Sequence, residues 1–415
     1  MNRKNTPKLR FKEFEKADPW EQRKLGEISN KVTKKNQDAV VDEVFTNSAE
    51  FGIISQRDFF EKDIANAENI DGYYVVEPDD FVYNPRISAT APFGPIKRNK
   101  LERTGAMSPL YYVFRPYDID LSYLEWYFQT TCWHSFMRFN GNSGARSDRF
   151  AITDKIFNEM PISMPQDIVE QKLIGTFLTK LESLITLHQR KYEKLKKVKN
   201  AYLDEMFPKN GERFPKRRFP GFTDPWEQRK LGEVSERVQG NDGRMDLPTL
   251  TISAANGWMS QEDRFSGNIA GKEQKNYTLL HKGELSYNHG NSKLAKYGTV
   301  FSLESYEEAL VPRVYHSFRM IDADASFIEY YFSTKIPDRE LAKLISSGAR
   351  MDGLLNISFD EFMGIKINLP SIQEQQKISY YLRQLDNLIT LHQRELDKLK
   401  KLKAAYLDAM FVGGK

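Results

Sequence analysis

Two short stretches of the sequence carry residue types that DNA-modifying enzymes use, and neither shows the full pattern. An enzyme that methylates adenine grips a base flipped out of the duplex, with an Asn/Asp-Pro-Pro-aromatic motif. The nearest match, Tyr83-Asn84-Pro85-Arg86, lacks the second proline and the aromatic residue, and its repeat, Tyr287-Asn288-His289-Gly290, has no proline. The glycine-rich segment FNGNSGAR from Phe139 has the wrong spacing for a cofactor loop. A methyltransferase site in this chain is therefore disfavoured.

Metal-dependent DNA cleavage needs clustered carboxylates around a hard cation. Asp263 followed by Glu273-Gln274-Lys275 has the letters of a nuclease signature, but the first half of the chain has no counterpart, so we interpret it as a solvated loop. There is no GKS or GKT phosphate loop and no Ser-His-Asp or Cys-His arrangement, and the single Cys132 does not cluster with the six histidines at zinc spacing. We expect no catalytic residue, metal or cofactor in this chain.

The composition indicates a folded protein of at least two domains. A chain of 415 residues exceeds the usual size of one core, and its 40% hydrophobic residues suffice for real cores. No run approaches the roughly 20 apolar residues of a membrane helix, and the start MNRKNTPKLRFKEFEK lacks a signal peptide's apolar segment. We therefore expect a cytoplasmic protein that does not bind membranes. The net charge of +4 permits a polyanionic partner without demanding one.

The elements that would position any site are duplicated, because the chain repeats itself at an offset of about 204 residues. DPWEQRKLGE at 18–27 returns at 224–233, SGAR at 143–146 returns at 347–350, and LITLHQR at 184–190 returns at 388–394. Even the lead-in PKLRFKEF from Pro7 resembles PKRRFPGF from Pro215. Between these anchors the halves diverge, so the frame is shared while its filling differs.

Each half contains a body of mixed secondary structure. Runs such as GYYVVEPDDFVYN and LYYVFRP predict strands, and LSYLEWYFQTT, echoed by ASFIEYYFSTK, predicts a helix. The fold class is α/β (α+β), with two tandem globular domains joined by two long antiparallel helices and an internal pseudo-twofold repeat. The predicted parts are a first domain at 1–165 with the repeat-opening motif at 18–27, a helix at 166–207, a linker at 208–223, a second domain at 224–369 and a helix at 370–411.

Each body is followed by a Lys-rich tail that predicts a long helix. Asp167 with Glu170, and Ser371 with Glu374, match the capping box of a helix start. Each helix would hold about 40 residues, span about 60 Å and need a partner for its apolar stripe. The stripe comprises Ile174, Phe177, Leu181, Leu184, His188, Leu195, Val198 and Tyr202, and in the second tail Ile378, Tyr381, Leu385, Leu388, His392, Leu399, Leu402 and Tyr406.

We expect the two helices to partner each other about the pseudo-twofold axis. The predicted midpoints lie beside His188 and His392, so we predict that these histidines approach each other and fix the register of the pair. In the alternative interpretation, each imidazole bonds a local partner or faces another subunit. We also predict that Trp20 and Trp226, in the repeat-opening motif, anchor each body to the neighbouring helices.

The repeated DPWEQRKLGE motif, the two variable bodies, and the tails ending KLKKVKNAYLDEMF and KLKKLKAAYLDAMF resemble the specificity subunit of type I restriction-modification enzymes. The resemblance covers nearly the whole chain. It implies that each body is a target recognition domain for one half of a bipartite double-stranded DNA site, and that the helices set the gap. It also implies two partner methyltransferase subunits that use S-adenosylmethionine, and two ATP- and Mg-dependent restriction subunits that translocate DNA.

Candidate DNA-binding residues divide into shared and private positions. Residues common to both halves cannot distinguish two half-sites, so they would hold phosphates, or in the alternative only shape a turn. Private residues would read base edges. The shared candidates are Ser143, Gly144, Arg146, Ser347, Gly348 and Arg350. The base-reading candidates are Arg57, Arg86, Lys97 and Arg98 in the first body and Arg264, Asn288, His289 and Lys293 in the second. Asn84 is a further candidate for DNA binding.

Two other functions stay open at this point. One is a self-contained methyltransferase or nuclease, which purified protein that turns over S-adenosylmethionine by itself would support. The other is a coiled-coil adaptor that binds only proteins. Loss of a bipartite adenine-methylation pattern from the host genome after deletion of the gene would refute the adaptor.

Overall fold

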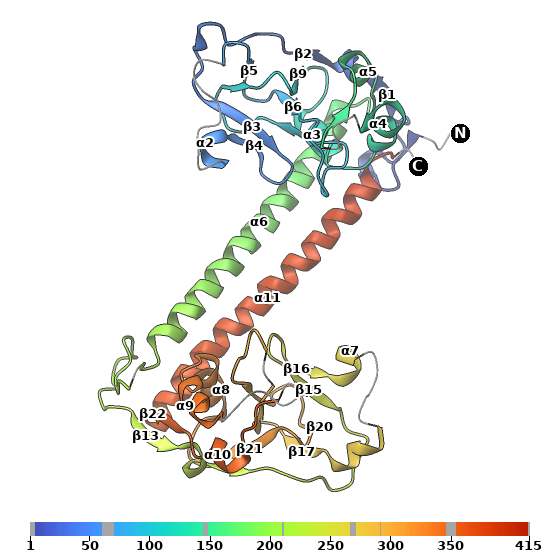
Figure 1. The fold of residues 1–415 in the computed structure, drawn as a ribbon. Helices are drawn as coiled ribbons and strands as arrows, with labels where there is room; N and C mark the ends of the chain where they lie inside the picture. The colour runs from blue at the N-terminus through green and yellow to red at the C-terminus, as the bar shows by residue number, and fades with distance from the viewer. Residues whose placement is uncertain are drawn as a thin grey trace. The chain divides into compact units, whose positions relative to one another are not determined.

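The computed structural model describes residues 5–59, 70–143, 148–209, 211–265, 271–290, 292–345 and 354–413. The chain forms two compact units (Figure 1). Unit 1 comprises Met1–Gln189 and Arg394–Lys415, and unit 2 comprises Arg190–Gln393. The long helices α6 (Ile168–Glu205) and α11 (Ile372–Met410) lie within the predicted helical ranges, and each contributes one part to each unit.

Unit 1 contains short strands and helices before α6. Its strands are β1 (Glu21–Lys24), β2 (Ser29–Lys31), β3 (Val44–Ser48), β4 (Gly52–Ser55), β5 (Tyr74–Val76), β6 (Phe81–Tyr83), β7 (Ile96–Arg98), β8 (Gly105–Met107), β9 (Tyr112–Pro116), β10 (Asn142–Ser143), β11 (Phe150–Ala151) and β12 (Pro161–Met164). Its helices are α1 (Leu25–Ile28), α2 (Gln56–Phe59), α3 (Leu121–Tyr127), α4 (His134–Asn140) and α5 (Asp154–Asn158).

Unit 2 follows a similar order. Its strands are β13 (Glu227–Lys230), β14 (Ser235–Arg237), β15 (Leu250–Ser253), β16 (Gly257–Ser260), β17 (Thr278–His281), β18 (Leu285–Asn288), β19 (Thr299–Ser302), β20 (Glu308–Val311), β21 (His316–Met320) and β22 (Lys366–Leu369). Its helices are α7 (Gln261–Phe265), α8 (Ala325–Ser333), α9 (Asp338–Leu344) and α10 (Phe359–Met363).

The sheets show that the duplication extends into the fold. The four-stranded sheet β2-β9-β6-β7 of unit 1 corresponds to β14-β21-β18-β19 of unit 2, and the pair β1-β12 corresponds to β13-β22. Unit 1 has a second four-stranded sheet, β4-β3-β8-β5, where unit 2 has the separate pairs β15-β16 and β17-β20. The predicted mixture of strands and helices in each half, and the repeat, are confirmed.

Tryptophans of the repeated motif anchor each body, as predicted. Trp20 is 2% exposed and its ring lies 6.5 Å from that of Phe411, just beyond α11. Trp226 is fully buried, 5.9 Å from the ring of Phe207, just beyond α6. Aromatic pairs at this spacing stabilise a core beyond the area that they bury. Each body is therefore packed against the end of a long helix.

Each long helix begins as expected, but the capping box is not closed. The amide of Val169 donates to Asp167 at 2.8 Å, and that of Glu374 donates to Ser371 at 3.4 Å. The carboxylate of Glu170 instead accepts two bonds from Arg10, at 2.6 and 2.7 Å, and the carboxylate of Glu374 binds another arginine in the same way. The predicted reciprocal bonds are replaced because the lead-in segment places an arginine over each carboxylate.

Within each unit, the α6 and α11 segments pack antiparallel. In unit 1, Phe177 contacts Tyr406 at 4.9 Å and Lys403 pairs with Glu182 at 2.6 Å. Because α6 numbers rise as α11 numbers fall, the segments run in opposite directions. The numbers of paired residues add up to about 584 in both contacts. If the same pairing continues along α6, His188 lies level with Leu396.

Unit 2 repeats this arrangement with its own residues. Tyr202 contacts Tyr381 at 5.0 Å, and Lys199 pairs with Asp386 at 2.6 Å. The predicted approach of His188 to His392 joins the two units and stays a prediction.

The predicted stripe is not buried along its whole length. Leu181 and Ile185 are each 8% exposed, whereas Leu184 is 47% and Leu388 is 42% exposed. In a straight helix, positions seven residues apart shift by about 20° around the axis with each repeat. One neighbouring helix therefore cannot cover every apolar position of the stripe. The inclusion of Leu184 and Leu388 in the buried stripe is therefore wrong. No helix in the described part of the chain is long and apolar enough to cross a membrane.

Candidate nucleic-acid interface

Asn84 and Asn288 end equivalent strands, β6 and β18, and make equivalent contacts. The amide nitrogen of Asn84 donates to the Asn47 carbonyl at 2.8 Å, and its oxygen accepts from the Arg86 amide at 3.0 Å. Asn288 donates to the Ile252 carbonyl at 3.2 Å and accepts from the Gly290 amide at 3.0 Å. Both ends of each side chain are engaged within the unit. The geometry thus supports a role in shaping the following loop, and direct DNA contact by either asparagine stays a prediction.

A glycine closes each of these loops. Gly94 has a φ of +81°, and a Cβ there would lie 2.0 Å from the Asn84 carbonyl oxygen. Gly298 has the same φ, and a Cβ there would lie 2.6 Å from the Asn288 carbonyl oxygen. Only glycine tolerates both the left-handed backbone and the close approach. The two units therefore build this loop with the same backbone device.

Arg86 lies exposed in the first of these loops, beside the strand pair that ends at the SGAR segment. Phe150 donates its amide to the Pro85 carbonyl at 2.8 Å, and Arg86 forms an isolated bridge with Arg149. The backbone of Ser143 pairs with Phe150 in β10-β11. The structure thus brings the loop after β6 next to the segment that flanks SGAR, while Gly144 and Arg146 lie outside the described residues.

Unit 2 has the corresponding pairing. The Leu355 amide donates to the His289 carbonyl at 2.9 Å, and Gly290 bridges Leu354. Ser347, Gly348 and Arg350 lie outside the described residues.

The His289 side chain was predicted to contact DNA, but it lies below the surface. It is 6% exposed, and its ring lies 4.8 Å from that of His316 and 6.0 Å from that of Tyr287. Burial lowers the pKa of His316, whose Nε2 bonds the Ile357 carbonyl at 2.8 Å. The His289 imidazole thus belongs to a buried aromatic cluster beneath the loop, and its contact with DNA stays a prediction.

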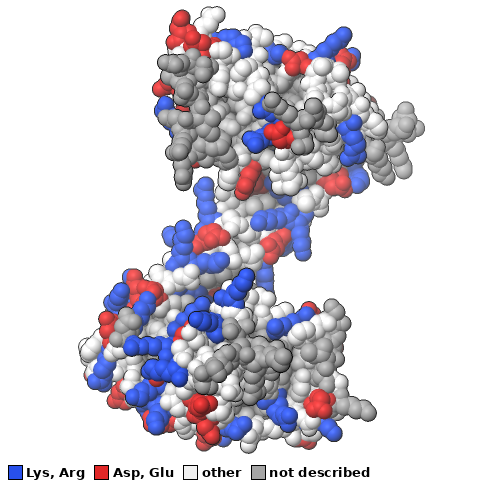
Figure 2. Space-filling model, in the orientation of Figure 1, with Lys and Arg blue, Asp and Glu red and all other residues white. Residues whose placement is uncertain are grey.

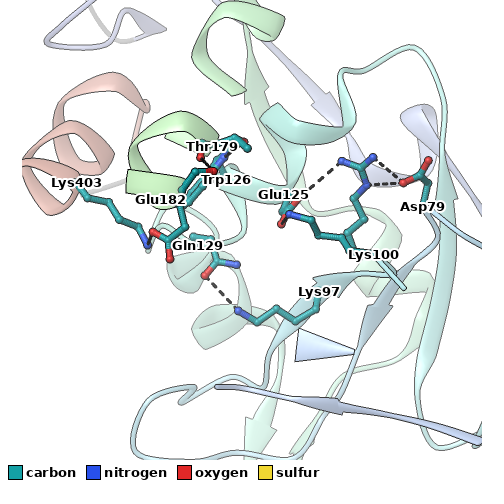
Figure 3. A network of polar contacts seen from close by, with 11 residues as sticks. Asp79, Lys97, Lys100, Glu125, Trp126, Gln129, Thr179, Glu182 and Lys403 are labelled. Carbon is teal, nitrogen blue, oxygen red and sulfur yellow. Dashed lines mark hydrogen bonds and ion pairs between the residues drawn. The ribbon is translucent and has the colours of Figure 1, made fainter. Parts of the chain in front are cut away.

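Lys97 (Figure 3) and its neighbour Arg98 make contacts within the fold of unit 1. Arg98 pairs with Asp79 at 2.6 Å and with Glu125 at 3.6 Å. Lys97 donates to Gln129 at 3.2 Å, and burial lowers the pKa of its ammonium group. These contacts tie β7 to α3 and the turn after it. The guanidinium of Arg98 is held by two carboxylates, whereas the ammonium of Lys97 has one amide partner. Base reading by Lys97 and Arg98 stays a prediction, and this geometry favours a structural role for Arg98.

The same network continues to the long helices of unit 1. The Trp126 indole donates to Thr179 of α6 at 3.0 Å. The ammonium of Lys403, from α11, lies 5.0 Å from the Trp126 ring centre and pairs with Glu182. The β7 region is thereby connected to both helices through α3 (Figure 3).

Three predicted contacts lie on exposed segments. Arg57 is exposed in α2, Arg264 is exposed in α7, and Lys293 is exposed in the loop between β18 and β19. Arg264 also donates to the Ile252 carbonyl at 2.6 Å, so its guanidinium is partly engaged. Helices α2 and α7 each follow a two-strand hairpin, β3-β4 or β15-β16. Arg57 and Glu262 each occupy the second position of their helix, so these equivalent positions carry opposite charges in the two units.

Sequence reasoning missed the arginine that binds each helix start. Arg218 donates to both oxygens of Glu374 at 2.7 Å, in the manner of Arg10 with Glu170. Both carboxylates are fully buried. The signal was present in the echoed lead-ins PKLRFKEF and PKRRFPGF, which place one arginine at the same point of each half.

The described residues contain many exposed side chains that can form hydrogen bonds, and few groups with the environment of a catalytic residue. No group of three or more His, Cys, Asp or Glu in the described ranges is placed to hold a metal ion. Burial raises the pKa of the Glu329 carboxyl group to about 7. Its carboxylate accepts from the Ser302 amide at 2.9 Å, inside unit 2. The exposed loops instead present hydrogen-bonding side chains around a rigid frame.

Comparison with known proteins agrees with this description. The family model described as "Type I restriction modification DNA specificity domain" matches twice, at residues 17–197 and 223–401. The type I restriction enzyme MjaVIII specificity subunit of Methanocaldococcus jannaschii is 22% identical over 277 residues. That alignment covers 63% of this chain and 64% of the relative, so the chain spans less than two thirds of the relative's length.

A solved structure shows a related fold. The S subunit of a type I restriction-modification system from M. genitalium is 12% identical, with a TM-score of 0.57, and the match covers 98% of this chain and 99% of that one. The HsdS subunit from Thermoanaerobacter tengcongensis is 15% identical, with a TM-score of 0.43 over 95% of this chain and 97% of that one. The first of these supports the two-unit fold.

Proposed function

The chain belongs to the type I restriction modification DNA specificity family, and we propose that it is the DNA specificity subunit of such a system. Each unit reads one half of a bipartite double-stranded DNA site. The chain itself catalyses no reaction. It selects the sequence at which partner subunits act, in the cytoplasm.

One observation carries this proposal: the two units have a similar arrangement of strands and helices but expose different side chains on it. Asn84 and Asn288 make the same two hydrogen bonds, yet the loop residue that follows is exposed Arg86 in unit 1 and Gly290 in unit 2. Base pairs are distinguished in the major groove by different patterns of donors and acceptors. Two frames with different side chains suit two different half-sites.

The long helices carry a surface suited to two copies of one partner. Leu184 and Leu187 are 47% and 45% exposed, and their repeats Leu388 and Leu391 are 42% and 53% exposed. Exposed apolar groups that recur in an identical heptapeptide, LITLHQR, favour an interface that is used twice. We assign these leucines to two methyltransferase subunits. These subunits would bring S-adenosylmethionine, and two restriction subunits would bring the ATP- and Mg-dependent activity.

The partner surface can be tested with a matched control on the same helices. Leu184→Glu combined with Leu388→Glu places charge on both apolar faces, so less methyltransferase subunit should co-purify with the chain. Thr186→Glu combined with Thr390→Glu adds the same charges at exposed equivalent positions and should leave co-purification unchanged. Equal loss from both pairs would assign the effect to charge on the helices and overturn the leucine assignment.

The function itself is tested by mapping N6-methyladenine across the host genome with and without the gene. The proposal predicts a bipartite methylated motif that disappears on deletion. Persistence of that motif would leave the coiled-coil adaptor as the better account. Turnover of S-adenosylmethionine by the purified chain alone would instead support a self-contained methyltransferase.

A further inference from the structure

Unit 2 contains a basic groove beside α9. The groove has a volume of about 630 Å³, and its charged lining consists of Lys209, Lys335, Arg339, Lys343, Lys366 and Glu340. Five cations thus face one carboxylate. Figure 2 shows Lys and Arg side chains gathered on the side of unit 2 where Figure 1 places α9, β13 and β22. We call this feature the α9 groove.

Several of these cations are not neutralised inside the protein. Lys343 pairs with Glu340, and Lys209 pairs with Asp204. Within the described residues, Arg339 and Lys366 are exposed and have no acidic side chain within ion-pair distance. The groove therefore keeps an excess of positive charge that faces solvent.

The strand pair beside the groove contains an unfavourable pairing of two cations. Lys366 of β22 lies directly opposite Lys230 of β13, and two residues along, Asn368 lies opposite Gln228 on the same face. Like charges directly opposite each other destabilise a sheet. Lys366 also lines the groove, so an anion bound there would lower its repulsion with Lys230.

Unit 1 shows that the fold does not need these charges. The equivalents of Lys335, Arg339, Lys343 and Lys366 in unit 1 are Thr131, Ser135, Phe139 and Pro161. The strand pairing is the same, since Pro161 lies opposite Lys24 as Lys366 lies opposite Lys230. Four uncharged residues therefore support the same local structure, and the cations of unit 2 serve something other than folding.

The groove adjoins a loop that was predicted to contact DNA. The ammonium of Lys335 donates to the Leu294 carbonyl at 3.2 Å. Leu294 directly follows Lys293, in the loop between β18 and β19. Arg339 and Lys343 stand one helical turn apart on α9, so their Cβ atoms are about 5–6 Å apart on one face. A row of cations of this kind suits an extended polyanion better than a single phosphate group.

We propose that the α9 groove holds the phosphate backbone of the DNA that flanks the half-site read by unit 2. The proposal rests on the function proposed above. It adds a contact that is independent of sequence and belongs to one unit only. Because each neutralised phosphate releases a counterion, two such contacts contribute about −1.8 to the slope of log affinity against log salt.

The test uses the full chain in complex with its methyltransferase subunits, and duplexes that carry the mapped methylation motif. One duplex ends at the last specified base pair of the unit 2 half-site, and the other continues for about 20 base pairs, or two helical turns. Arg339→Ser combined with Lys366→Gln should weaken binding of the long duplex by about tenfold to hundredfold near 0.1 M salt. The salt slope should fall by about 1.8, while binding of the short duplex and the methylated motif stay the same.

Lys282→Gln combined with Arg319→Ser is the matched control. These residues lie outside the groove and pair with Glu307 and Glu236, so removal of the same charge should change affinity by less than about twofold. Unchanged binding of the long duplex by the groove variant would overturn the proposal. Equal weakening on both duplexes, or loss of methyltransferase subunits with DNA binding intact, would overturn it as well. If instead no duplex is preferred over a scrambled sequence, the proposed function fails, whatever the groove does.

Discussion

Replacement of Arg218 by methionine tests how the lead-in segment holds the start of α11. Arg218 donates to both oxygens of Glu374 at 2.7 Å, and the Glu374 side chain is 1% exposed. Removal of the guanidinium leaves a buried carboxylate without its cation. Such single removals cost about 3–5 kcal/mol, a large share of the roughly 5–15 kcal/mol that stabilises a folded protein.

The double variant gives the sharper measurement. A buried ion pair often contributes little net stability, so Arg218→Met combined with Glu374→Gln should recover most of the loss. Urea unfolding of the four proteins of this cycle yields the coupling free energy, which we expect to exceed about 2 kcal/mol. Arg10→Met should cost somewhat less, because the Trp20 indole also donates to Glu170, at 3.4 Å. A cost below about 1 kcal/mol for Arg218→Met, or additive effects in the cycle, would refute this reasoning.

Three further predictions concern a proton, a turn and the helix register. The Glu329 pKa is raised from 4.5 to about 7, so the native state binds more protons than the unfolded state between these values, and stability falls as pH rises through them. Glu329→Gln should therefore resist urea better than the wild type at pH 8, by up to about 3 kcal/mol, and match it below pH 4.5; equal stability of the two at pH 8 would contradict the assignment. Gly94→Ala should lower the free energy of unfolding of unit 1 by at least about 2 kcal/mol in urea titrations, because its Cβ would clash with the Asn84 carbonyl. Gly72→Ala, whose Cβ meets no atom within 4 Å, should leave this free energy unchanged. Equal effects of the two changes would show that the close approach to Asn84 is unimportant. If His188 and His392 meet, a chain with cysteine at both positions and Cys132→Ser should form an internal disulfide on oxidation, whereas efficient crosslinking only between His188→Cys and Leu396→Cys would favour an offset register.

The sequence predicted those features that are repeated within it. The long helices, the helix starts at Asp167 and Ser371, and the tryptophan anchors all follow from patterns that appear twice. Repetition, however, does not reveal which partner a side chain selects. Glu170 matched a capping box, but its carboxylate binds Arg10, 160 positions earlier, because the fold brings the lead-in across the helix start.

Candidate site residues were harder to predict, because residue type says little about burial. Arg98 and His289 carry groups that read DNA in other settings. In this fold, Arg98 is held by Asp79 and Glu125, while His289 lies under its loop. The α9 groove gave no sequence signal either, since Lys209, Lys335 and Lys366 come from separate segments that only the tertiary structure brings together. Shared positions were predictable from the repeat, whereas the surfaces that distinguish the units required the structure.

The central claim, that each unit reads its own half of the site, is tested most directly by giving both units the same body. In such a chain, residues 18–165 replace residues 224–369, with both long helices kept, and the methylated motif is mapped across the host genome. The account predicts a new motif in which the half-site of unit 1 occurs twice, as an inverted repeat about the gap. Methylation that stays at the original asymmetric motif, in a chain that still folds and binds its methyltransferase subunits, would contradict it.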